Sequence, residues 1–166
     1  MAFVLLGTAT FALANAQSKE NRLHAELSGS SEVPAVSSTG HGKFVAQVAP
    51  GDDYFTYELS YDGLEGSVLQ AHIHLGQKSV NGGIMIWLCG TASNPGPAGT
   101  PICPSPGGTV SGTVSAAEVI GPAGQGIAAA EWLEALAALR SGVAYANVHS
   151  TKHPGGEIRG QINSAG

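Results

Sequence analysis

Residues 71–75 read Ala-His-Ile-His-Leu, a stretch in which apolar and polar side chains alternate. On a β-strand successive side chains point to opposite faces, so Ala71, Ile73 and Leu75 are predicted to face a core. His72 and His74 then project together from the other face. This stretch therefore predicts both a strand and a pair of neighbouring imidazoles.

The same alternation recurs along the chain, in segments bounded by Gly, Pro, Asn, Asp or Ser, the residues that favour turns. The predicted strands are 23–27, 44–48, 55–61, 71–75, 84–88, 109–114, 143–149 and 158–162. About eight short strands at this spacing indicate an all-β sandwich or barrel.

One segment, 128–140, has a helical pattern instead of an alternating one. Trp132, Leu136 and Leu139 recur at helical spacing, Arg140 lies in the last turn, and Gly142 follows as a stop signal. We expect a short crossover helix that covers part of the sandwich.

Composition limits the classes of partner. The chain has 166 residues, of which 43% are apolar, so it has enough apolar side chains for a single-domain core. Its formal net charge of -5 argues against nucleic acid, because phosphate binding requires a basic face. A polybasic membrane anchor is excluded for the same reason.

The first 16 residues, MAFVLLGTATFALANA, form a short apolar run that ends in a small-x-small pattern. This pattern predicts a signal peptide over residues 1–16, and the run is too short to span a bilayer. The alternative is an apolar first strand. We expect a secreted or periplasmic protein without a membrane span after cleavage, with a single domain over 17–166 and a core over about 22–163.

Both cysteines flank a loop that is rich in Gly and Pro. Cys89 and Cys103 stand at the two ends of CGTASNPGPAGTPIC. An even cysteine count in an exported protein predicts one disulfide. A thiolate metal site is the alternative, but no further Cys or His stands nearby at zinc-ligand spacing.

Two further predicted strands have a polar face. In 143–149, Tyr145, Asn147 and His149 lie opposite the apolar face, and beside 158–162 the polar face holds Glu157 and Arg159. If these strands adjoin 71–75, three imidazoles form an open site with Arg159 close by, and nitrogen ligands suit copper and zinc. Solvated outer faces, with Glu157 and Arg159 paired to each other, are the alternative interpretation.

Four segments, 25–34, 71–76, 142–150 and 154–162, resemble the signature of the chordin-type (CHRD) domain, in the order of that family. The resemblance covers nearly the whole mature chain and is to single-domain bacterial members, which are mostly of unknown function. It implies an extracytoplasmic β-sandwich of immunoglobulin-like Greek-key type. In animals such domains occur in chordin, an antagonist of bone morphogenetic proteins.

The chain also resembles, more weakly, the copper/zinc superoxide dismutases. The order of His72, His74, His149 and Arg159 is similar to their copper ligands and substrate-guiding Arg, but no loop of zinc ligands is found. This comparison implies a zinc-free copper site of His72, His74 and His149. His153 and His41 are candidate fourth ligands, and Arg159 and Glu157 are expected beside the ion.

These observations are consistent with three hypotheses about function. The first is copper binding by the His-x-His pair and His149. The second is a metal-free module that binds another extracellular protein or a cell surface. The third is a copper-dependent enzyme similar to superoxide dismutase, although the chain has no nucleophile elbow or phosphate loop. The sequence therefore favours a binding protein over an enzyme.

Overall fold

The computed structural model describes residues 21–164 of the chain. The predicted signal peptide, residues 1–16, lies outside the described residues. Within them, no helix is long and apolar enough to cross a membrane.

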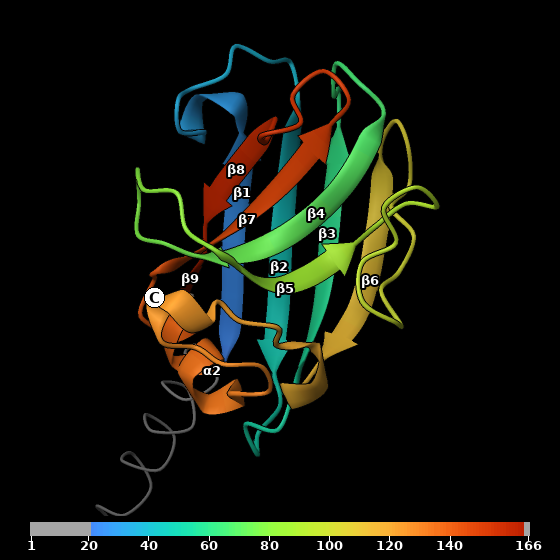
Figure 1. Ribbon diagram of the computed structural model, residues 1–166. Coiled ribbons are helices and arrows are strands. Elements are labelled where there is room, and N and C mark those ends of the chain that lie inside the picture. The colour runs from blue at the N-terminus through green and yellow to red at the C-terminus, as the bar shows by residue number, and fades with distance from the viewer. Residues whose placement is uncertain (1–20, 165–166) are drawn as a thin grey trace, which may run out of the picture.

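Nine strands and one α-helix make up the described part of the chain (Figure 1). The strands are β1 (Arg22–Ser28), β2 (His41–Val48), β3 (Phe55–Asp62), β4 (Val68–Leu75), β5 (Ile84–Cys89), β6 (Gly108–Val114), β7 (Ala144–Ser150), β8 (Ile158–Gln161) and β9 (Asn163–Ser164). Helix α2 (Trp132–Arg140) connects β6 to β7, and short 3-10 turns occupy Gly29–Ser31, Ala116–Glu118 and Ala123–Gln125.

The strands pair antiparallel in the order β5-β4-β7-β8-β1-β2-β3-β6, with β9 beside β1. Figure 1 shows β4, β5 and β7 crossing in front of β2 and β3, so the sheet folds back over itself. The segment after β6 bridges to β5 through Val119 and Ile86, which nearly closes the structure. The all-β sandwich prediction is confirmed, and the helix crosses from one layer to the other as predicted.

The apolar core lies between the two layers. Strand β3 follows the sequence pattern closely, because its inward side chains Phe55, Tyr57, Leu59 and Tyr61 are buried while the residues between them are largely exposed. Strand β7 differs, because all of its residues are buried. The alternative of solvated outer faces is therefore wrong for β7.

Two connections cover the outer face of β4, β7 and β8. The 76–83 connection is held by Arg159, which donates to the backbone carbonyls of Gln77 and Val80. The connection after β1 is held by Asn147, which donates to the Glu32 carboxylate. Side chains on this face are thus enclosed by polar loop contacts instead of by water.

Most strands begin or end one to three residues away from the predicted positions, and two boundaries have a clear structural reason. Helix α2 begins at Trp132 and not at residue 128, because Ala130 has a left-handed φ of 67° and the Glu131 carboxylate accepts from the backbone N–H of Ala128. The predicted strand 158–162 ends at Gln161, and the next residues form β9 against β1.

The predicted disulfide is present. Cys89 and Cys103 are bonded, with their Cα atoms 5.0 Å apart, and both are buried. The bond closes the Gly- and Pro-rich loop over the end of β5. The cysteine metal site is therefore excluded.

At Gly160, strand β8 passes close to the backbone of β1. A β-carbon there would lie less than 3.0 Å from the Glu26 carbonyl. We expect Gly160→Ala to lower the free energy of unfolding by about 1 to 3 kcal/mol, as overpacking against backbone does. Gly124, with nothing within 4 Å of its β-carbon position, is the matched control. Urea unfolding of both variants tests this, and equal stabilities would contradict it.

Candidate metal centre

The three predicted histidine ligands come together across two neighbouring strands. His72 and His74 stand on β4, and β7 pairs beside it in a register that sets Gln70 opposite His149. His149 is therefore one diagonal step from His72, within reach of a long side chain. Each of the three offers one ring nitrogen, and these nitrogens lie within 4.8 Å of one another.

All three imidazoles are buried, with exposed fractions of 0% for His72, 8% for His74 and 6% for His149. This burial results from the loops described above, which cover the outer face of β4 and β7. Among the described residues, the group contains only nitrogen ligands. An ion held there would be shielded from bulk water.

Backbone carbonyls fix the orientation of two of the rings. Nδ1 of His74 lies 3.0 Å from the Gly82 carbonyl oxygen, and Nδ1 of His149 lies 3.0 Å from that of Pro154. Because a carbonyl only accepts, each Nδ1 carries the proton and each Nε2 keeps a lone pair. Metal-ligating histidines in proteins are held in the same way through their second nitrogen.

The third ring, that of His72, leaves a buried nitrogen without a partner. Its Nδ1 lies 3.3 Å from Nε2 of His149, which can only accept, so Nδ1 of His72 donates. Nε2 of His72 and Nε2 of His74 are both buried and have no hydrogen-bond partner among the described residues. Such atoms are rare in native proteins. Two orphaned lone pairs in one buried group are what a bound cation would satisfy. An ion held by all three rings would also replace the hydrogen bond between His72 and His149, because that bond occupies the Nε2 lone pair of His149.

Aromatic rings hold the imidazoles from the sides. The centroid of Trp87 lies 4.3 Å from that of His72, edge to face. The ring of Tyr145 stacks on His74 at 4.8 Å with an interplanar angle of 3°. The Arg159 guanidinium lies 3.4 Å from the Tyr145 ring centroid. This packing limits the freedom of the rings before any ion binds.

Burial keeps the cluster uncharged. Desolvation lowers the pKa of His72 to about 2 and that of His74 to about 4, and repulsion from His149 adds to both effects. The hydrogen bond to Gly82 opposes the shift at His74. Desolvation also lowers the pKa of His149. At neutral pH the cluster therefore offers neutral imidazoles, the form that binds metals.

The remaining predicted site residues occupy different places. Arg159 is buried, and its guanidinium packs on Tyr145, whose ring stacks on His74. Glu157, which was also expected beside the ion, is buried, accepts from Ser38 and belongs to a different group of ligand-type side chains. His153 lies with Glu65 in a separate group.

His41, the other candidate fourth ligand, is exposed at the start of β2. Its Nδ1 lies 3.3 Å from the Thr39 carbonyl oxygen. Of the five predicted histidine positions, the structure thus brings together His72, His74 and His149 and leaves His153 and His41 elsewhere.

Sequence reasoning missed two residues near the centre. Glu32 is buried, accepts from Asn147, and has its pKa raised by burial to about 7. Its place in the CHRD-like segment 25–34 is the signal that was available. Trp87 belongs to the alternating pattern of β5, which gives no sign that its ring meets His72.

An antiparallel β-sandwich with a buried three-histidine cluster defines the class of this protein. The family model described as CHRD domain matches residues 23–162, so the chain belongs to the CHRD domain family. No curated protein and no solved structure matches it.

The lowered histidine pKa values predict acid sensitivity of the metal-free protein. Below pH 6.5, the ordinary pKa of His72, the unfolded chain binds protons that the folded chain does not, so the free energy of unfolding falls as pH falls. From about pH 7 to about pH 5, His72 alone should account for about 2 kcal/mol of this loss. Urea unfolding with a chelator should show a smaller pH dependence for His72→Gln than for the wild type. Identical pH dependence would contradict the assignment.

Proposed function

We propose that this protein binds one copper ion through His72, His74 and His149. The observation that carries the proposal is the pair of buried, unpartnered Nε2 atoms of His72 and His74 beside the ring of His149. The residues fit a metal ion by their chemistry, because all three imidazoles are neutral and two are oriented through Nδ1.

The ligand set favours copper over the alternatives. Three nitrogens without carboxylate or thiolate do not suit Mg²⁺ or Ca²⁺, which prefer oxygen. Copper(II) binds nitrogen sites more tightly than zinc in the general affinity order, and structural zinc is usually held by four ligands. The ion supplies a positive centre that satisfies the orphaned lone pairs. The chain contributes the ligands, their orientation and the exclusion of water.

Arg159 has a positioning role in this proposal. Its guanidinium packs on Tyr145, and the Tyr145 ring packs on His74. Arg159 therefore helps to hold the His74 ring in place through one intervening aromatic side chain. Its hydrogen bonds to the carbonyls of Gln77 and Val80 also hold the connection that covers the cluster. Copper capture or storage in a closed site is the role that this arrangement supports best.

The compartment proposed for this activity is outside the cytoplasm. The Cys89–Cys103 disulfide supports it, because such bonds persist in oxidising compartments and are rare in the cytosol. The proposal treats residues 17–166 as one mature domain that remains after removal of the signal peptide.

Copper titration tests the function directly. We expect the wild type to bind about one equivalent of Cu(II), and His74→Gln and His149→Gln to lose about tenfold or more in affinity because each removes a ligand. His41→Gln, which alters an exposed histidine, is the matched control and should bind as the wild type does. Isothermal titration calorimetry measures the affinities, and circular dichroism verifies that each variant is folded.

Two outcomes would overturn the proposal. One is wild-type binding that does not exceed that of folded His74→Gln and His149→Gln. The other is an equal loss of binding in His41→Gln. The first result would favour the metal-free interaction module, and the second would mean that copper binding is not specific to the buried cluster.

A further inference from the structure

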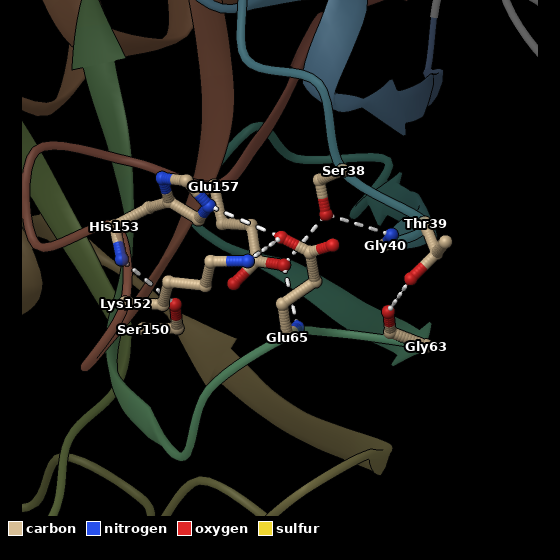
Figure 2. Close-up of polar contacts among 9 residues, drawn as sticks. All are labelled: Ser38, Thr39, Gly40, Gly63, Glu65, Ser150, Lys152, His153 and Glu157. Atoms are coloured by element: carbon tan, nitrogen blue, oxygen red, sulfur yellow. Dashed lines mark hydrogen bonds and ion pairs between the residues drawn. The ribbon is translucent and has the colours of Figure 1, made fainter.

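A second group of ligand-type side chains lies where the turn between β7 and β8 meets the connection between β3 and β4. Glu65, His153 and Glu157 each offer one ligand atom, and these atoms lie within 4.8 Å of one another. Figure 2 shows the two carboxylates and the imidazole converging, with the Lys152 side chain among them. Two segments far apart in the sequence therefore meet at one point.

Glu157 provides the strongest indication that a cation belongs here. The residue is fully buried. Its Oε1 accepts from the Ser38 hydroxyl at 2.6 Å and from the backbone N–H of Glu65 at 2.7 Å. Its buried Oε2 has no well-formed hydrogen bond among the described residues. The Ser150 hydroxyl lies near enough to help lower the pKa of the carboxyl but does not satisfy this oxygen with good geometry. A buried carboxylate oxygen that is satisfied so incompletely is costly, so it indicates an additional positive partner.

Glu157 is also held as an anion. Burial raises the pKa of its carboxyl, but the hydroxyls of Ser150 and Ser38 and the amide of Glu65 outweigh burial and lower that pKa. The hydrogen bonds from Ser38 and Glu65 fix the orientation of the carboxylate. Carboxylates that ligate metals are oriented by hydrogen bonds of this kind.

Lys152 already brings a positive charge to this group. Its Nζ lies 2.7 Å from Oε2 of Glu65, and Nε2 of His153 lies 3.4 Å from the same oxygen. The Lys152 side chain is 55% exposed, and exposed ion pairs of this type contribute little to stability. The ammonium group can therefore leave for solvent at little cost when another cation arrives.

We propose that Glu65, His153 and Glu157 form a second metal site, which takes a divalent transition ion of the Zn²⁺ type and displaces Lys152. One imidazole and two carboxylates match the nitrogen and oxygen ligands of zinc. The imidazole makes the group a poor site for Ca²⁺ or Mg²⁺, which prefer oxygen ligands alone. The bound ion would join the turn before β8 to the connection before β4.

Zinc binding by three variants tests this site. Equilibrium dialysis with Zn²⁺ should show that Glu65→Gln weakens one binding event by about tenfold or more, because a charged ligand is lost. Lys152→Ala should strengthen the same event, because a competing cation is removed. Glu58→Gln removes the same charge as Glu65→Gln, but at an exposed position on β3. It is the control and should bind zinc as the wild type does. All three variants leave His72, His74 and His149 intact, so the result does not depend on copper binding.

A second measurement locates the ion. Zinc addition should shift the imidazole ¹⁵N resonances of His153 in the wild type and leave them unchanged in Glu65→Gln at the same zinc concentration. Equal zinc affinity of the wild type and Glu65→Gln would overturn the proposal. An unshifted His153 ring in the zinc-saturated wild type would overturn it as well.

Discussion

The antiparallel pairing of β4 with β7 is the constraint on which the rest of the site depends. Its register brings His72 and His74 from one strand next to His149 from the other. Both strands are buried on both faces over most of their length, so the imidazoles cannot be solvated. They must be neutral, hydrogen-bonded or bound to an ion, and the two orphaned nitrogens show that protein hydrogen bonds alone do not satisfy them.

The connection between β7 and β8 links the two proposed metal sites. The carbonyl of Pro154 orients His149 toward the buried cluster, and the preceding residue, His153, turns toward Glu65. Glu157, at the end of the same connection, lies in the second group. A single turn thus carries residues of both groups, the nitrogen ligands that we propose for copper on one side and the mixed nitrogen and oxygen ligands that we propose for zinc on the other.

Alternation in the sequence was sufficient to predict the strands and the three histidines, because side-chain direction on a strand has a fixed period of two. Burial of the polar face was not predictable in this way. This burial depends on the 76–83 connection, which contacts Arg159, and on Glu32, which contacts Asn147. Both contacts form between residues that are distant in sequence. For the same reason the sequence could not separate His153 from the His72 cluster or place Glu157 with Glu65.

We propose that His72, His74 and His149 together hold one copper ion, and X-ray absorption at the copper edge of the copper-loaded protein is the sharpest test. We expect a first shell with three imidazole nitrogens at about 2 Å, the usual metal–nitrogen distance for histidine, together with their outer-ring scattering. A first shell with fewer than three imidazoles would contradict it.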